Sequence, residues 1–219
     1  MDGTVERVRG PSGELALRRA GGHFEIISNG VFLMDTRDGR SERALVAAAL
    51  DGPRGPYDVL IGGLGVGFSL REALDTPGTR RVTVVEIEPA VITWNRGPLG
   101  AVVGEPLNDP RTEVVNADLV AWIRAGTGRY DAICLDIDNG PGWTVTEENA
   151  GLYTGAGLDA LIARLAPGGR LAVWSAAAAP EFARRLESRF DAVRTVEVPV
   201  PRGEPDVVYV SSGPRTAGR

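Results

Sequence analysis

The fold of this chain is decided by the stretch VLIGGLGVG, residues 59–67. The apolar run 59–61 predicts a strand, and the segment 69–74 after the glycines has the pattern of a helix. Glycine in such a turn lets the backbone bend tightly and approach a ligand closely, because it carries no Cβ. Gly63, Gly65 and Gly67 have the spacing G-x-G-x-G, which differs from the dinucleotide fingerprint G-x-G-x-x-G. The loop therefore predicts either a plain turn or a nucleoside-binding turn of another kind.

The pattern on both sides of this loop predicts a parallel sheet. Strands are expected at 58–61, 82–85, 112–115, 132–135 and 171–174, and helices at 69–74, 90–95, 119–123 and 158–165. Strands that are apolar throughout and alternate with helices are typical of a parallel sheet covered on both faces. We therefore assign the chain to the α/β class.

The C-terminal end closes this sheet with a hairpin. After a helix at 181–190, strands are expected at 193–200 and 207–210, joined by a turn at 201–205. So short a turn cannot make a parallel crossover, so this pair must be antiparallel. A mostly parallel, seven-stranded, Rossmann-like sheet with an antiparallel C-terminal hairpin resembles the class I methyltransferase fold.

The N-terminal segment has a different pattern. Short apolar runs at 15–17, 24–27 and 31–34 flank the pair Asn29-Gly30, and such a pair is a strong signal for a β-hairpin. The segment 41–50 begins with serine and glutamate and continues with apolar residues, as a short helix does. We expect an N-terminal hairpin unit at 1–50 and a larger nucleoside-binding domain at 51–219.

The composition excludes several classes of function. The 24 basic residues are all arginine, so the chain can supply neither a pyridoxal phosphate lysine nor a P-loop lysine. With one histidine, His23, and one cysteine, Cys134, no His/Cys zinc cluster and no disulfide within the chain can form. A site made only of carboxylates and water could still hold magnesium, but we expect no metal site. A net charge of −5 argues against nucleic acid and anionic membranes as partners. No signal-like or membrane-spanning apolar run is present, so we expect a cytoplasmic protein.

Polar residues that follow the predicted strands form the candidate cofactor site. Glu86 ends the second strand about 20 residues after the glycine loop, where an acid accepts hydrogen bonds from ribose hydroxyls. Ile87 beside it is placed to cover an adenine face, and Asn116 and Asp118 follow the third strand. The carboxyl ends of parallel strands form the usual ligand crevice. The predicted nucleoside-binding residues are Gly62, Gly63, Gly65, Gly67, Glu86, Ile87, Asn116 and Asp118.

The fourth strand ends in Asp136-Ile137-Asp138-Asn139, which we take as the reaction face. A carboxylate there can remove a proton from an attacking amine, and two neighbouring acids raise the pKa of one of them. We expect Asp136 and Asp138 to be catalytic and Asn139 to line the substrate pocket, although Asp138 also fits an Asx-turn. Trp143 and Tyr153 are candidates for an aromatic wall against a cationic amine, with simple packing of a lid as the alternative.

These segments together resemble the spermidine synthase family of aminopropyltransferases. The hairpin NGVFLMDTRD, residues 29–38, is similar to that family's "DGV.Q.T.RDE" segment, and the similarity continues to about residue 174. It implies that Asp136 is the base. The chain departs from the family at Gly65, where the family has an aspartate that holds the donor's ammonium, and at Leu33, which replaces a glutamine. Its Tyr-Gln-Glu motif falls near 42–44, which reads Glu-Arg-Ala here.

The resemblance implies a donor of the S-adenosylmethionine type, carboxylated or decarboxylated, and a small amine acceptor. Because the ammonium-binding aspartate is missing, we expect methyl transfer slightly in preference to aminopropyl transfer. One alternative is a true aminopropyltransferase whose diamine site is rebuilt from Asp35, Glu42 and Asp138. A second alternative is a non-catalytic nucleoside-binding protein. The resemblance and the edge hairpin also predict a homodimer.

Overall fold

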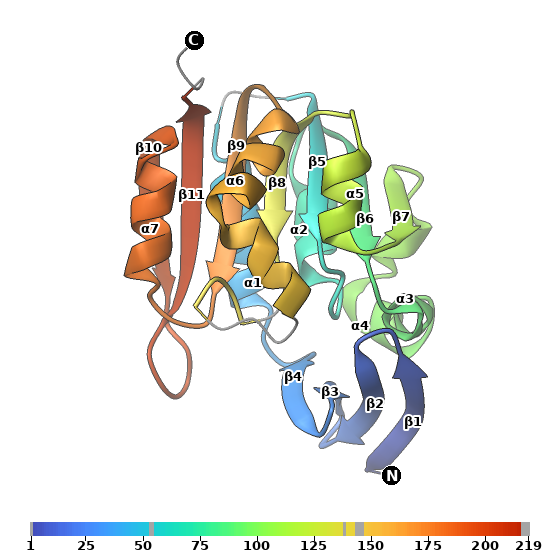
Figure 1. Cartoon of the computed structure of the whole chain (residues 1–219). Coiled ribbons are helices and arrows are strands. Elements are labelled where there is room, and N and C mark those ends of the chain that lie inside the picture. The colour runs from blue at the N-terminus through green and yellow to red at the C-terminus, as the bar shows by residue number, and fades with distance from the viewer. Residues whose placement is uncertain (1, 53–54, 138, 143–146, 216–219) are drawn as a thin grey trace.

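The computed structural model describes residues 2–52, 55–137, 139–142 and 147–215. It contains two sheets, a large one of seven strands and a small N-terminal one of four (Figure 1). The strand order of the large sheet is β10-β11-β9-β8-β5-β6-β7. Its strands are β5 (Tyr57–Gly62), β6 (Thr79–Glu86), β7 (Thr112–Asn116), β8 (Tyr130–Leu135), β9 (Leu165–Ser175), β10 (Phe190–Val198) and β11 (Asp206–Pro214).

The pairing of the large sheet confirms the predicted fold class. β5 pairs in parallel with β6 and with β8, β6 with β7, and β8 with β9. β11 pairs antiparallel with both β9 and β10, which forms the predicted C-terminal hairpin. Because β11 runs against its neighbours, its first residue, Asp206, lies at the edge where the parallel strands end.

Helices cover both faces of this sheet (Figure 1). Alternate residues of β5 face opposite ways, so Val59 and Ile61 belong to one core cluster and Leu60 to the other. The first cluster includes residues of α1, α2, α3 and α4, and the second includes residues of α5, α6 and α7. The helices are α1 (Arg40–Leu50), α2 (Phe68–Asp75), α3 (Pro89–Asn95), α4 (Pro98–Val103), α5 (Leu119–Ala125), α6 (Gly155–Ala163) and α7 (Pro180–Glu187), with short 3₁₀ helices η1 (Pro106–Asn108) and η2 (Glu147–Tyr153).

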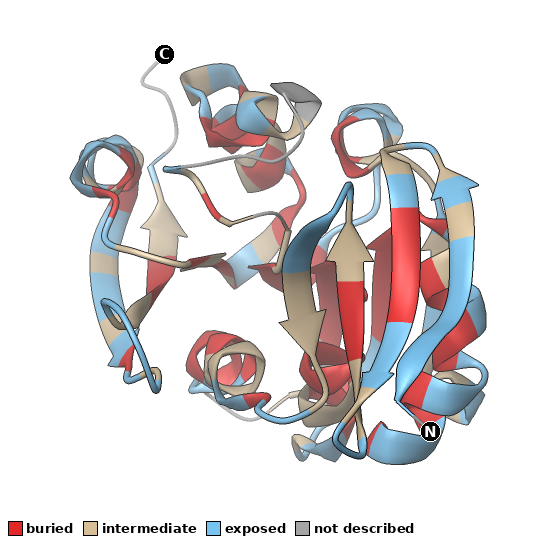
Figure 2. Cartoon of the chain, turned by 90° about the horizontal axis from the view of Figure 1, so that it is seen from below, coloured by how far each residue is buried: buried red, intermediate tan, exposed pale blue. Residues whose placement is uncertain are grey.

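The small sheet lies below the carboxyl ends of the large sheet's strands (Figure 1). It is an antiparallel meander of β1 (Gly3–Gly10), β2 (Gly13–Ala20), β3 (His23–Ser28) and β4 (Val31–Asp35). Asn29 and Gly30 both have positive φ, 49° and 80°, as a type I′ turn requires, so the predicted hairpin is confirmed. The outer strand β1 was not expected from the sequence; most of its residues are exposed, whereas β2 carries a buried run (Figure 2).

Some predicted helix ends were wrong. The helix expected at 158–165 ends at Ala163, because β9 already begins at Leu165. The helix expected at 181–190 ends at Glu187, and Phe190 starts β10 with a buried side chain. The helix α1 packs against the large sheet through β9 and β11. The division of the chain at residue 50 stays a prediction. None of the helices in the described ranges is long and apolar enough to span a membrane.

Candidate active site

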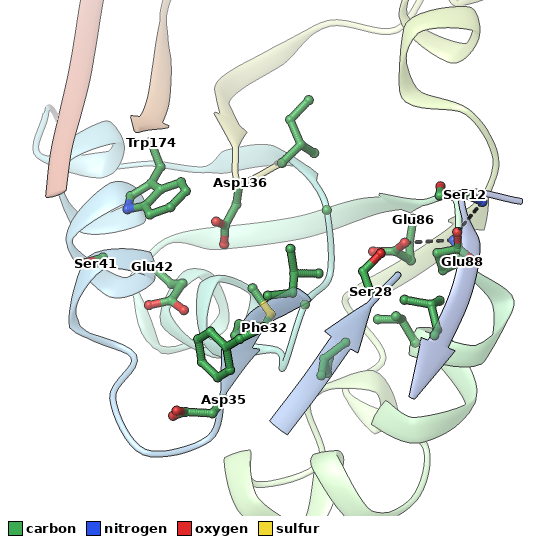
Figure 3. Close-up of a pocket in the computed structure, with 18 of the residues that line it drawn as sticks. Ser12, Ser28, Phe32, Asp35, Ser41, Glu42, Glu86, Glu88, Asp136 and Trp174 are labelled. Carbon is green, nitrogen blue, oxygen red and sulfur yellow. Dashed lines mark hydrogen bonds between the residues drawn. The ribbon is translucent and has the colours of Figure 1, made fainter. Parts of the chain in front are cut away.

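A cavity of about 890 Å³ lies between the small sheet and the carboxyl ends of the large sheet's strands. Figure 3 shows two ends of it: Glu86 and Glu88 with Ser12 and Ser28 at one, and Asp136, Glu42, Ser41 and Trp174 at the other. We call these the glutamate end and the aspartate end. Both sheets therefore build the same site.

The glycine loop enters this cavity through Gly63 and Gly65. Gly63 has φ +90°, and a Cβ there would lie 2.2 Å from the carbonyl oxygen of Asp136. Gly65 has φ +52°, and a Cβ there would lie 2.6 Å from the sulfur of Met34 on β4. A side chain at Gly63 is therefore excluded by φ and by the backbone oxygen, whereas one at Gly65 is disfavoured by φ and requires the flexible Met34 side chain to move. Gly62 ends β5, and Gly67, with φ +94°, precedes α2; neither lines the cavity.

Glu86 lies at the end of β6 and is buried. Its Oε2 accepts the backbone N–H of Leu64 at 2.8 Å, and its Oε1 accepts the backbone N–H of Glu88, also at 2.8 Å. Burial raises the pKa of this carboxyl, and the two backbone hydrogen bonds oppose that rise. Glu86 thus fixes the glycine loop while its carboxylate lines the cavity, and Ile87 lines it as well.

The structure separates the two polar residues predicted after β7. The amide nitrogen of Asn116 donates to the carbonyls of Glu86 and Ile87, at 2.8 and 3.0 Å. Asn116 is not among the residues that line the cavity, so it supports the loop after β6 from outside. Asp118 lines the cavity, and its Oδ1 also accepts the backbone N–H of Ala121 at 2.6 Å, as the cap of α5.

Three carboxylates from distant parts of the chain meet at the aspartate end: Glu42, Asp136 and Asp206. Burial raises the pKa of Asp136 to about 6, and Asp206 adds to the rise, whereas the hydroxyl of Ser69, which donates at 2.8 Å, lowers it. Burial raises the pKa of Glu42 to about 8, with further contributions from Asp136 and Asp206. Ser41 donates its hydroxyl to Asp206 at 2.5 Å.

The other acids on the β4–α1 side of the cavity are neutralised by arginines. Asp35 accepts from the Arg37 Nε at 2.7 Å, and Asp38 accepts from the Arg40 Nε at 2.9 Å. Both acids line the cavity, and the Arg40 hydrogen bond keeps the pKa of Asp38 below its ordinary value. Asp35 is thus in the predicted pocket but carries its own counter-charge.

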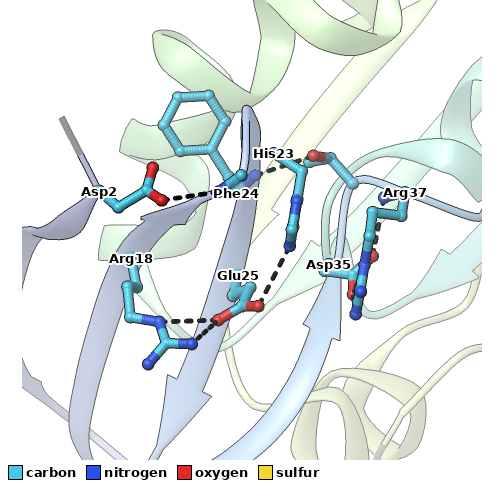
Figure 4. A network of polar contacts seen from close by, with 9 residues as sticks. Asp2, Arg18, His23, Phe24, Glu25, Asp35 and Arg37 are labelled. Carbon is cyan, nitrogen blue, oxygen red and sulfur yellow. Dashed lines mark hydrogen bonds and ion pairs between the residues drawn. The ribbon is translucent and has the colours of Figure 1, made fainter.

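His23 lies in a separate polar network on the small sheet (Figure 4). Its Nε2 is 3.1 Å from Glu25, which also accepts from Arg18 at 2.8 Å. Burial acts to raise the pKa of Glu25, but the hydrogen bonds from His23 and Arg18 outweigh it, so the pKa lies below its ordinary value. His23 is not among the residues that line the cavity.

Not all of the residues predicted for the acceptor pocket line the cavity. Asn139 does not line the cavity; its backbone carbonyl accepts from the N–H of Ala176. Tyr153 is buried elsewhere, with its ring edge-on to Phe182, so it forms no wall of the cavity. Asp138 and Trp143 lie outside the described residues.

Trp174, at the end of β9, is an aromatic side chain at the aspartate end, and Phe32 of β4 lines the cavity as well. Trp174 and Asp206 were not assigned to the site from the sequence. One signal for Asp206 was present: an antiparallel last strand must begin at the edge where the parallel strands end.

Comparison with known proteins gives consistent relatives. Residues 41–178 match the family model for the spermine/spermidine synthase domain. The chain is 38% identical over 138 residues to polyamine aminopropyltransferase 1 of Streptomyces coelicolor, which covers 62% of this chain and 25% of that protein. It is 33% identical over 186 residues to the polyamine aminopropyltransferase of Corynebacterium efficiens, which covers 82% of this chain and 34% of that protein. The chain thus spans about a quarter to a third of the length of these relatives.

Two solved structures have the same fold. A spermidine synthase in complex with the transition state analogue AdoDATO superposes with a TM-score of 0.77 at 18% identity, over 96% of this chain and 73% of that chain. The spermidine synthase from Thermotoga maritima gives a TM-score of 0.75 at 18% identity, over 96% and 72%. At this identity the likeness shows the fold alone.

The relatives correct one expectation from the sequence. They are named for aminopropyl transfer, and the matching family model is that of spermine and spermidine synthases, so the preference for methyl transfer was wrong. The residue on which that preference depended, Gly65, is one position in a site that both sheets build. Because the family model matches more than half of the chain, the chain belongs to the spermine/spermidine synthase domain family.

Proposed function

We propose that this chain transfers an aminopropyl group from decarboxylated S-adenosylmethionine to a small amine. The observation that carries the proposal is the aspartate end of the cavity, where Glu42, Asp136 and Asp206 meet beside the glycine loop. A cavity wall with three such carboxylates favours a cationic substrate. The names of the relatives support the same chemistry.

At the glutamate end, the residues suit the nucleoside of the donor. Glu86 is held by two backbone N–H groups, so its carboxylate is oriented before a ligand arrives and can accept from both ribose hydroxyls. Ile87 offers an apolar surface to the adenine, and Asp118 offers an acceptor to its amino group. The bare backbone at Gly63 and Gly65 lets the sulfonium portion lie close to the loop.

Asp136 is the general base in this proposal. Its raised pKa of about 6 suits proton removal from an ammonium or amine near neutral pH, and the Ser69 hydroxyl fixes its orientation. The freed nitrogen lone pair attacks the donor's propyl carbon, so the new N–C bond forms as the C–S bond breaks. The electron pair of that bond stays on sulfur, and a neutral thioether nucleoside leaves.

The test is turnover of the purified chain with decarboxylated S-adenosylmethionine and a panel of small amines, followed by detection of the thioether nucleoside and the aminopropylated amine. We expect Asp136→Asn to lower kcat by roughly 10²–10⁴-fold, the usual contribution of a general base. Donor affinity should stay within about threefold, a difference of ~0.6 kcal/mol.

Asp38→Asn is the matched control, because Asp38 lines the same cavity but is paired with Arg40. Donor binding without any product over the whole amine panel would overturn the proposal in favour of a non-catalytic nucleoside-binding protein. Methylated product from S-adenosylmethionine, with none from its decarboxylated form, would overturn it as well.

A further inference from the structure

Glu88 is a buried acid at the glutamate end of the cavity that the proposed chemistry leaves unused. It directly precedes α3, where an acidic side chain ordinarily accepts an N–H of its own helix, but it forms no such bond. Its Oε1 instead accepts the backbone N–H of Ser12 at 2.8 Å, 76 residues away in the sequence (Figure 3). The side chain of Glu88 therefore reaches from the large sheet to the small one.

The turn between β1 and β2 packs tightly on this carboxylate. A Cβ on Gly10 would overlap the Oε2 of Glu88, so a side chain at residue 10 would displace that oxygen. Within the described residues, Oε2 is buried and has no hydrogen-bond partner, so the Ser12 N–H is what compensates the carboxylate for its loss of water. Glu88 thus holds the turn by one hydrogen bond and by close contact with Gly10.

A second polar contact ties β1 to α3. The indole nitrogen of Trp94, which is buried in α3, donates to the carboxylate of Glu6 on β1 at 2.7 Å. Because α3 follows Glu88 directly, β1 and the turn after it rest on the start of α3 and on its last full turn. The small sheet is therefore docked on α3 and on the residue before it.

This docking matters for the nucleoside, because residues from both sides of the contact line the cavity. Ser12 and Ser28 reach the glutamate end from the small sheet, and Glu86 reaches it from the large one (Figure 3). The backbone N–H of Glu88 also donates to Oε1 of Glu86 at 2.8 Å. One residue thus connects the turn of the small sheet to the carboxylate that is proposed to bind the ribose. A nucleoside that contacts both sheets stabilises their docking, and docking strengthens its binding by the same factor.

We infer that Glu88 is a positioning residue for the donor: its carboxylate docks the small sheet as one wall of the nucleoside site. Affinity for the donor and docking of the β1–β2 turn then depend on each other. This inference rests on the proposed function, which places the nucleoside at the glutamate end. The reacting groups lie at the aspartate end, so loss of the contact should affect binding of the donor and not the chemical step.

The first test compares the wild-type chain with Glu88→Ala and Glu88→Gln. Calorimetry gives the affinity for methylthioadenosine, a thioether nucleoside, and turnover gives kcat and the KM for decarboxylated S-adenosylmethionine. We expect Glu88→Ala to weaken the affinity and raise this KM by roughly tenfold, equal to about 1.4 kcal/mol. Its kcat at saturating donor should stay within about twofold of wild type. Glu88→Gln keeps an oxygen that accepts the Ser12 N–H, so its affinity should stay within about threefold.

The matched control is Glu14→Gln, which alters an exposed acid of the same small sheet that is paired with Arg7. It should leave the affinity, the KM and kcat unchanged. Circular dichroism of each variant shows whether it is folded.

Hydrogen exchange gives a readout that a general loss of stability would not reproduce. In the wild-type chain, saturating methylthioadenosine should slow exchange of the amides of residues 10–20, among them the Ser12 N–H that bonds Glu88. In Glu88→Ala at saturating nucleoside, this slowing should be lost. The slowing at Leu64, whose N–H bonds Glu86 on the large sheet, should persist.

Gly10→Ala tests the same contact from the other side and leaves Glu88 in place. Its methyl group would displace Oε2, so it should weaken the affinity for the nucleoside on its own. In the double variant with Glu88→Ala it should add little, because the oxygen that it displaces is gone. If Glu88→Ala does not fold, Gly10→Ala provides the affinity and exchange measurements in its place.

The outcomes separate this inference from the proposed function. Unchanged affinity in Glu88→Ala, or equal slowing of exchange in residues 10–20 with and without the Glu88 carboxylate, would overturn the inference while the proposed function stands. Additive effects of Gly10→Ala and Glu88→Ala would overturn it as well. If the wild-type chain binds neither methylthioadenosine nor decarboxylated S-adenosylmethionine, the proposed function itself fails.

Discussion

Glu42 is a carboxyl of the cavity whose pKa is raised well above its ordinary value. It lies in the first turn of α1, faces Asp136 and Asp206 in the cavity, and has a pKa raised to about 8 by burial and by those neighbours. The ordinary value for this carboxyl is 4.5. Between these two values the folded chain holds a proton that the unfolded chain releases.

The stability of the chain should therefore depend on pH in a defined direction. Because the folded state binds more protons in this window, the contribution of Glu42 to stability is fully present below about pH 4.5 and is lost as the pH rises toward about 8. Glu42→Gln should remove much of this loss and raise Tm at about pH 8 relative to wild type. The rise should be roughly 2–4 °C for each kcal/mol gained in the free energy of unfolding. Tm is measured by thermal unfolding of both proteins over this pH range. Parallel Tm curves for the two proteins would contradict the assignment.

At the scale of elements, the turn between β5 and α2 is fixed from outside as well as by its own glycines. Gly65 faces the sulfur of Met34, and the side-chain amide of Asn95 donates to the Gly65 carbonyl at 2.8 Å. Asn95 is itself buried in α3 and also bonds the Val91 carbonyl. The small sheet and α3 thus hold the same loop from two sides.

Gly65→Ala tests this arrangement. The new Cβ would lie 2.6 Å from the Met34 sulfur, and alanine at a φ of +52° carries a conformational cost of about 1–2 kcal/mol. We expect lower stability and at least a severalfold weaker donor affinity, measured by denaturant unfolding and calorimetry. Adding Met34→Ala should recover the part of the lost stability that comes from the contact between the new Cβ and the Met34 sulfur. It should not recover the part that comes from the positive φ at residue 65. A wild-type-like Gly65→Ala would show that the loop adapts freely.

The elements differ in how far the sequence predicted them. The central strands β5 and β8 were predictable because both faces of the sheet are covered there, so each strand is a nearly continuous apolar run. β1 was missed because it is an edge strand: its sequence, GTVERVRG, contains no apolar run, and most of its residues are exposed. The nucleoside residues Glu86 and Asp118 follow strands directly and were found. Asp206 was not found, because its place in the site depends on contacts between segments 165 residues apart.

At the scale of the whole molecule, the small sheet has a free edge. β4 is the last strand of that sheet, and it pairs with β3 alone among the described strands. Val31 on it is 64% exposed, whereas Phe32, which is 53% exposed, lines the cavity. Exposed apolar residues on an unpaired strand edge favour pairing with another chain. We therefore expect a homodimer that forms through β4.

Val31→Lys tests the dimer. A lysine on the strand edge opposes edge-to-edge pairing but keeps the strand's own hydrogen bonds with β3. Light scattering should give about twice the chain mass for the wild type and the monomer mass for Val31→Lys, with unchanged circular dichroism. A monomeric wild type, or a dimer that persists in the variant, would exclude β4 as the interface. Val102→Lys on α4, which is also exposed, is the matched control.

The thiol of Cys134 can serve as a probe of the opening of the large sheet. It is the one cysteine in the sequence, it is fully buried in β8 between Ile61 of β5 and Ala172 of β9, and burial raises its pKa far above the ordinary value. A thiol-specific reagent can react only when the centre of the sheet separates. The labelling rate of the unmodified protein therefore reports how often the whole fold opens. A ligand that binds only the closed form must lower this labelling rate in proportion to its occupancy.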